Sequence, residues 1–206
     1  TGLAVTELCF GALPMGPLQA NMPVDKGSAV IRKALEEGIN FIDTAEIYQT
    51  YQHIAQALKG FAGEVIIATK STASTYEEME KSINKALKEL ERPYIDIFLL
   101  HAARAGANIF QEREGALRCL KDYKAQGLVR HIGISTHSVE AVQAAITQED
   151  MEIIFPIINM TGFGIIKGSQ QDMLAAIEKA HQAGKGLYAM KVLAGGNLLD
   201  RLEEAI

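Results

Sequence analysis

The sequence predicts an α/β fold in which parallel strands alternate with helices. Short continuous apolar runs, typical of strands buried on both faces, alternate with segments whose apolar residues repeat about every 3.6 residues, as in amphipathic helices. No Ser/Gly/Pro-rich linker or low-complexity segment divides the 206 residues. We therefore expect a single domain over residues 1–206.

Seven apolar runs are the candidate strands, and the helices are expected between them. The runs cover residues 9–13, 40–44, 65–70, 95–101, 129–135, 152–159 and 186–193. The clearest helix is "TYEEMEKSINKALKELE" at 75–91, where Thr75 is expected to cap a first turn that contains Glu77 and Glu78. Its apolar face consists of Met79, Ile83, Ala86, Leu87 and Leu90. The other expected helices cover residues 26–38, 52–59, 113–126, 138–148 and 169–183, with C-terminal caps at Gly60, Gly127 and Gly184.

Such alternation fits either an open doubly wound sheet or a closed TIM (β/α)8 barrel. The stretch "CFGALPMGPLQ" lacks the GxGxxG of a dinucleotide-binding doubly wound sheet, which favours the barrel. Only seven strands are found, and the final "NLLDRLEEAI" is typical of a helix after strand seven. We therefore expect an incomplete (β/α)8-type barrel of about seven β/α units, truncated before its eighth strand.

Composition limits the class of partner. The net charge of -5 argues against nucleic acid and against an acidic membrane surface, which favours a small-molecule ligand. Cys9 and Cys119 lie far apart and form no CxxC pattern, so we expect two buried, reduced thiols and no disulfide framework. No leader and no apolar run near the roughly 18 residues that span a bilayer is found, which indicates a cytoplasmic protein.

Polar side chains end several of the predicted strands. Asp43, Lys70 and His101 end strands two, three and four, and Tyr48 follows strand two. Because the carboxyl ends of parallel strands meet on one face of a barrel, we expect these four groups to converge. Asp43 is the expected partner that neutralises buried Lys70.

This cluster predicts acid–base chemistry on an oxygen atom. A fixed Lys70 ammonium beside Tyr48 is expected to favour the phenolate and to lower the pKa of Tyr48 from roughly 10. His101 is placed to orient a substrate oxygen that Tyr48 protonates.

The blocks "FIDTAEIY", "IIATKS" and "FLLHA", in this order and at these strand ends, resemble the aldo-keto reductase superfamily. The resemblance covers nearly the whole chain and implies reduction of an aldehyde or ketone, or oxidation of an alcohol, with NADPH or NADH. It implies Tyr48 as general acid, Lys70 and Asp43 as its tuning pair, and His101 as the residue that positions the carbonyl. "YQTYQHIAQALKG" is similar to a bacterial branch that often carries an appended iron–sulfur domain, although cluster-forming cysteines are absent here.

The resemblance also implies a nicotinamide site. Ser135 and Asn159 match the family's carboxamide-binding serine and amide, and Met190 stands where a tyrosine often stacks on nicotinamide. Lys191 is expected to line the same pocket. NADPH is the expected cofactor, with NADH as the alternative, and the tryptophan that often follows the catalytic histidine is missing, so the carbonyl substrate is not specified.

Three other functions remain open at this point. A metal-dependent hydrolase would use Asp43, Glu46, His101 and His137, but no HxH or HxxxH spacing supports it and no metal site is predicted. A Schiff-base aldolase would use Lys191. A cofactor-binding or regulatory remnant without turnover would agree with the missing strand, and the open sheet edges predict self-association.

Overall fold

The computed structural model describes residues 1–206 and contains one parallel sheet of seven strands in the order β1-β2-β3-β4-β5-β6-β7. The strands are β1 (Phe10–Gly11), β2 (Phe41–Asp43), β3 (Ile66–Ser71), β4 (Ile95–His101), β5 (Val129–Thr136), β6 (Ile153–Pro156) and β7 (Gly186–Leu187). The sheet is curled and does not close, because β1 and β7 each have one hydrogen-bonded neighbour. The predicted incomplete barrel is therefore confirmed.

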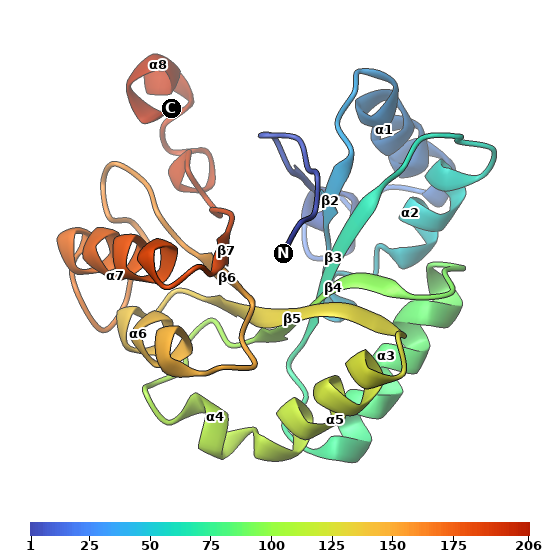
Figure 1. Ribbon diagram of the computed structural model, residues 1–206. Helices are drawn as coiled ribbons and strands as arrows, with labels where there is room; N and C mark the ends of the chain where they lie inside the picture. Colours follow the sequence, from blue (N-terminus) through green and yellow to red (C-terminus); the bar gives the residue numbers. More distant parts are fainter.

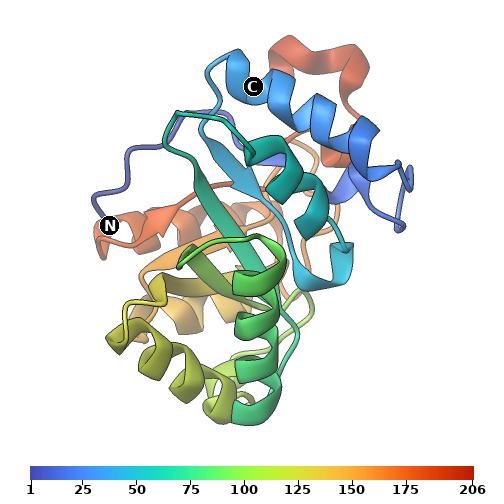
Figure 2. The same cartoon turned by 90° about the vertical axis from the view of Figure 1, so that its right-hand side faces the viewer.

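Helices surround the outside of the curled sheet (Figure 1). They are α1 (Val24–Glu36), α2 (Tyr51–Leu58), α3 (Tyr76–Glu89), α4 (Ile109–Glu112), α5 (Glu114–Ala125), α6 (Val139–Thr147) and α7 (Gln170–Gln182), whereas α8 (Leu202–Ala205) lies apart from the sheet near the C-terminus. In the view turned by 90°, α1 and α2 lie in front of β2 and β3 (Figure 2). Short 3-10 helices η1 (Leu13–Met15), η2 (Glu46–Tyr48), η3 (Ala194–Gly196) and η4 (Leu199–Arg201) complete the chain.

The core has two parts because successive strand residues point to opposite faces of the sheet. One cluster of 39 buried residues lies between the strands and the helices. A second cluster of seven fills the inside of the curl, and it consists of Phe41, Ile66, Ala68, Ile97, Leu99, Ile153 and Phe155. Asp43 lies two residues after Phe41 on β2, and Lys70 lies two residues after Ala68 on β3. Both side chains therefore point to the same face of the sheet as this cluster.

Helix ends agree with the caps predicted from the sequence. Thr75 and Glu78 form a capping box at the start of α3, with Glu78 N 3.2 Å from Thr75 Oγ1 and Thr75 N 3.1 Å from Glu78 Oε2. Gly60, Gly127 and Gly184 have φ values of 70°, 75° and 74°, the left-handed conformation that favours glycine after a helix.

Four predicted strands are shorter than the sequence suggested, and β2 lacks one predicted residue at each end. β1 and β7 are edge strands that pair on one side only, which leaves fewer hydrogen bonds to hold them. β6 ends at Pro156 because the chain then turns around Asn159, whose Oδ1 accepts from Phe163 N at 2.9 Å. β7 continues only as an isolated bridge between Ile157 and Met190.

The C-terminal segment also differs from its prediction as one helix. It forms the short elements η4 and α8, and its apolar side chains Leu199, Leu202 and Ile206 are exposed. A helix this short has little stability of its own without an apolar face packed against a core. The cysteines are free thiols, as expected, but only Cys119 is fully buried and Cys9 is partly exposed.

Candidate active site

A buried ion pair lies at the carboxyl end of β2 and β3. Lys70 Nζ is 2.6 Å from Asp43 Oδ1 and 2.8 Å from Asp43 Oδ2, and it donates to the Thr44 carbonyl oxygen at 2.7 Å. Lys70 is 1% exposed and Asp43 is 7% exposed. Each of the three hydrogens on the Lys70 ammonium therefore has a hydrogen-bond acceptor, and these bonds compensate for burial of the charge.

The pKa of the Asp43 carboxyl reflects opposing effects. Burial raises it, while the positive charge and hydrogen bonds of Lys70, together with a hydrogen bond from Tyr188, act to lower it. The short, two-pronged contact with Lys70 is the geometry of a charge-assisted pair. The pairing expected from the sequence is thus present in the structure.

Tyr48 ends η2 and lies above this pair. Lys70 Nζ is 5.0 Å from the centroid of the Tyr48 ring, and the ring meets that of His101 edge to face at 6.0 Å and 89°. Burial, followed by the negative charge of Asp43, raises the pKa of Tyr48 above its usual value. The expectation that this pKa is lowered is wrong for this structure, because burial disfavours the charged phenolate and outweighs the effect of the nearby Lys70 ammonium.

His101 ends β4 on the opposite side of the cluster from Asp43. Burial lowers the pKa of His101 to about 3, with further lowering from the positive charges of Lys70 and Arg113. The imidazole is therefore neutral near pH 7 and carries one ring N–H donor. Its Nδ1 atom is buried and has no hydrogen-bond partner within the chain.

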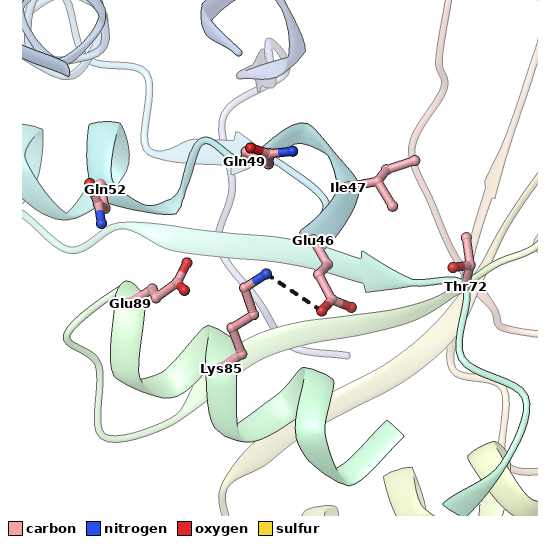
Figure 3. A pocket seen from close by; sticks show the side chains of 7 residues that line it. All are labelled: Glu46, Ile47, Gln49, Gln52, Thr72, Lys85 and Glu89. Atoms are coloured by element: carbon pink, nitrogen blue, oxygen red, sulfur yellow. Dashed lines mark ion pairs between the residues drawn. The ribbon is translucent and has the colours of Figure 1, made fainter. Parts of the chain in front are cut away.

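Glu46, at the start of η2, ties the tyrosine-bearing helix to its neighbours. Its Oε2 accepts hydrogen bonds from Ser71 Oγ at 2.9 Å and from Ser82 Oγ at 2.7 Å, and Lys85 Nζ is 3.7 Å from its Oε1. Figure 3 shows Glu46 and Lys85 facing one another across a polar pocket of about 600 Å³ between η2, α2 and α3. Since Ser71 directly follows Lys70, this contact connects the Tyr48 segment to the strand that carries Lys70.

The four residues predicted to bind the cofactor end β5 or follow β6 and β7. Ser135 is buried and pairs in register with His101. Met190 O accepts from Ile158 N at 3.2 Å, which brings Met190 close to the loop that begins at Asn159. Lys191 is exposed, with its Nζ 3.3 Å from His137 Nε2. Burial, followed by the charge of Lys191, lowers the pKa of His137 to about 4.

Asn159 is partly committed to its own loop. Its Oδ1 accepts from Thr161 N and Oγ1 and from Phe163 N, and its Nδ2 donates to Phe163 O at 2.9 Å. One amide hydrogen remains after these bonds. Asn159 is therefore placed at the rim, but with less free hydrogen-bonding capacity than the sequence suggested.

Two aromatic residues of the site were not found from the sequence. Tyr188 donates a hydrogen bond to Asp43 Oδ2 at 3.1 Å and stacks on Phe155 with ring centroids 3.8 Å apart. The pairing register of the strands would have identified them. Phe155 pairs with Ser135, and Tyr188 lies two residues after Gly186, which pairs with Ile153 two residues before Phe155. Period two applied across the paired strands places all of them inside the curl.

The structure is thus that of a barrel-type β/α protein in which a buried Asp–Lys pair, a tyrosine and a histidine lie together at the carboxyl rim of the sheet. The aldo/keto reductase family model matches residues 7–205, and the chain belongs to this family. The family predicted from the sequence is therefore confirmed.

Individual relatives agree with this assignment. L-galactose dehydrogenase of Arabidopsis thaliana is 26% identical over 98% of this chain and 66% of its own length. Methylglyoxal reductase DkgA of Escherichia coli (strain K12) is 27% identical over 79% of this chain and 62% of its own length. The chain thus spans slightly less than two thirds of these relatives. The aldo-keto reductase AKR11C1 from Bacillus halodurans has the same fold, with a TM-score of 0.77, 21% identity, and coverage of 98% of this chain and 67% of that one.

Two further observations concern the other kinds of site and location considered from the sequence. No group of three or more His, Cys, Asp and Glu side chains is placed to hold a metal ion. No helix combines the length and apolarity needed to cross a membrane.

Proposed function

We propose that this chain is an NAD(P)H-dependent oxidoreductase that reduces an aldehyde or ketone to an alcohol. The observation that carries the proposal is the convergence of Tyr48, Lys70, Asp43 and His101 at one rim of the sheet. Such a cluster supplies a proton donor, an orienting group and a fixed positive charge around one oxygen atom. Membership of the aldo/keto reductase family supports the same reaction class.

Tyr48 is the proton donor in this proposal. Because its pKa is raised, the phenol remains protonated at neutral pH and can give its proton to the carbonyl oxygen as that oxygen gains negative charge. The Lys70 ammonium, 5.0 Å from the ring centroid, stabilises the phenolate that results. Asp43 keeps this ammonium fixed and charged.

His101 orients the carbonyl. Its neutral imidazole donates one hydrogen bond to the carbonyl oxygen without competing with Tyr48 as an acid. The edge-to-face contact with Tyr48 places the two rings next to each other at the rim. The two donors together stabilise negative charge that develops on that oxygen.

The rim residues fit a nicotinamide dinucleotide. Ser135 and the remaining amide hydrogen of Asn159 suit the carboxamide, Met190 offers an apolar surface for the ring, and the exposed Lys191 ammonium suits an anionic cofactor. The bound nicotinamide would supply the hydride. We propose NADPH as the preferred form, with NADH as the alternative.

Substrate, partners and location complete the proposal. The substrate is a small carbonyl compound, and methylglyoxal is the first to test because a relative is named for its reduction. The chain acts in the cytoplasm as a single domain. Its open sheet edges at β1 and β7 favour self-association.

The test is consumption of NADPH, followed by absorbance, with methylglyoxal and a panel of aldehydes and quinones. Tyr48→Phe should lower kcat by at least about 100-fold, because it removes the proton donor and little packing volume. Tyr123→Phe, which removes a buried tyrosine hydroxyl on α5 away from the rim, is the matched control and should keep its turnover. Near-normal turnover of Tyr48→Phe would overturn the assignment of the proton donor.

A further inference from the structure

Tyr188 lies inside the curl of the sheet, next to the Asp43–Lys70 pair. It follows Gly186 by two residues, so its side chain has the same orientation as the inner cluster. The ring stacks on Phe155 at 3.8 Å and 12°, and its centroid is 5.0 Å from that of Phe41. The phenol is thus held on two sides by aromatic rings.

The Tyr188 hydroxyl connects two segments of the open sheet that are far apart in the sequence. It donates to Asp43 Oδ2 at 3.1 Å, which links the segment after β7 to β2 across 145 residues of sequence. Phe155 also contacts the pair directly, because Lys70 Nζ is 5.3 Å from its ring centroid. Tyr188 and Phe155 therefore form an aromatic boundary of the ion pair.

Four titratable groups face the Asp43 carboxylate, each from a different element. They are Lys70 of β3, Tyr48 of η2, Tyr188 after β7 and Cys9 before β1. Among these side chains, Lys70 and Tyr188 donate hydrogen bonds to the carboxylate. A buried carboxylate stays ionised only while such donors compensate for the loss of water.

We propose that Tyr188 is a positioning residue for the Asp43–Lys70 pair. Its hydroxyl keeps the Asp43 carboxylate ionised and oriented toward Lys70, and its stacking on Phe155 fixes the direction of the hydroxyl. This role rests on the proposed function, since it acts through the pair that stabilises the Tyr48 phenolate. Tyr188 itself touches neither the substrate nor the cofactor in this proposal.

The decisive measurement is independent of turnover. The protein is labelled with ¹³C in its aspartate carboxyl groups, and the Asp43 signal, assigned with Asp43→Asn, is titrated by NMR. Tyr188→Phe keeps the stacked ring and removes the hydroxyl, so the Asp43 titration should move to higher pH by about one unit. Tyr123→Phe is the matched control and should leave the titration unchanged. An unchanged titration in Tyr188→Phe would overturn the proposal.

A second substitution tests whether the Asp43 pKa moves in the opposite direction when the hydroxyl becomes a stronger donor. Incorporation of 3-fluorotyrosine at position 188 keeps the hydroxyl and makes it a stronger donor, so the Asp43 titration should move to lower pH. This experiment decides the question even if Tyr188→Phe does not fold. A titration that stays in place or moves upward would show that the hydroxyl does not stabilise the carboxylate.

Kinetics then connects the proposal to the reaction. In Tyr188→Phe, the acid limb of the pH profile for kcat should move upward in parallel with the Asp43 titration, while KM for the carbonyl changes less than about twofold. A shifted titration with no turnover in the unsubstituted protein would refute the proposed function and leave the role of Tyr188 in the ion pair intact. A shifted titration with an unshifted kcat profile would refute its role in positioning.

Discussion

At the scale of single residues, the site depends on how burial changes the charges of a few side chains. Lys70 is almost completely enclosed, yet it keeps partners for all three of its hydrogens. His101 is enclosed among positive charges and stays neutral. The same burial therefore preserves one charge and suppresses another, because only Lys70 has a carboxylate partner.

Lys70→Met is expected to destabilise the protein by about 3 to 5 kcal/mol, because it leaves the Asp43 carboxylate buried without its cation. The double variant Asp43→Asn with Lys70→Met should recover a large part of this loss, since the remaining groups are uncharged. Urea denaturation of both variants checks the prediction. A double variant no more stable than Lys70→Met would show that the pair is not what stabilises this region.

The lowered pKa values of two histidines predict how the stability of the protein depends on pH. The pKa of His101 is lowered to about 3 and that of His137 to about 4, so the unfolded chain binds more protons than the folded chain below the ordinary imidazole value of about 6.5. Stability contributed by these groups is therefore present above about pH 6.5 and is lost as the pH falls toward about 4 for His137 and about 3 for His101. Urea denaturation at about pH 7 and at about pH 5 measures the loss.

Two separate histidine substitutions, one at the site and one at the surface, provide the test and the control for this measurement. His101→Gln should reduce the difference in stability between the two pH values, whereas His181→Gln, at an exposed position on α7, should leave it as in the unsubstituted protein. An equal reduction in both variants would contradict the assignment of the effect to the buried site.

At the scale of elements, the position of Tyr48 depends on η2, a helix of only three residues. Such a short element has little stability of its own. Glu46 holds it through Ser71 on β3 and Ser82 on α3, so that two long elements position the tyrosine. The polar pocket beside it is lined by the same glutamate (Figure 3).

Removing this contact should reduce turnover without removing any group of the reaction. Ser82→Ala and Glu46→Gln are expected to lower kcat by about threefold to tenfold, the equivalent of about 0.7 to 1.4 kcal/mol, because η2 is then held less firmly. Glu89→Gln is the matched control, since Glu89 lines the same pocket and makes no hydrogen bond to the two serines. Equal kcat values for Glu46→Gln and Glu89→Gln would refute the anchoring role.

At the scale of the whole molecule, the sheet is strongest at its centre and weakest at its ends. β3, β4 and β5 are long and paired on both sides, whereas β1 and β7 are two-residue strands with one open edge each. Open edges present unpaired backbone donors and acceptors. Stability is therefore expected to decrease from β4 outward.

Hydrogen exchange measured by mass spectrometry checks this gradient. Backbone amides of β4 should be protected most and those of β1 and β7 least, because opening of the edges requires fewer hydrogen bonds to break. If the edges mediate self-association, their protection should rise with protein concentration while that of β4 stays constant. Uniform protection across the sheet would contradict both expectations, and light scattering at the same concentrations reports the association independently.

The periodicity of the apolar residues and the local composition were sufficient to predict the alternation of strands and helices, the caps at Thr75 and Gly127, and the four polar groups at the rim. Each of these features depends on residues that are close together in the sequence. Only the tertiary structure decided three further properties. Tyr188 meets Asp43 because the sheet curls, which brings together residues 145 positions apart. The pKa of Tyr48 is raised rather than lowered because burial of the phenol, followed by the negative charge of Asp43, depends on how the distant segments pack around it. The edge strands are short because a strand's length depends on its neighbours, and no local pattern in the sequence specifies how many neighbours a strand will have.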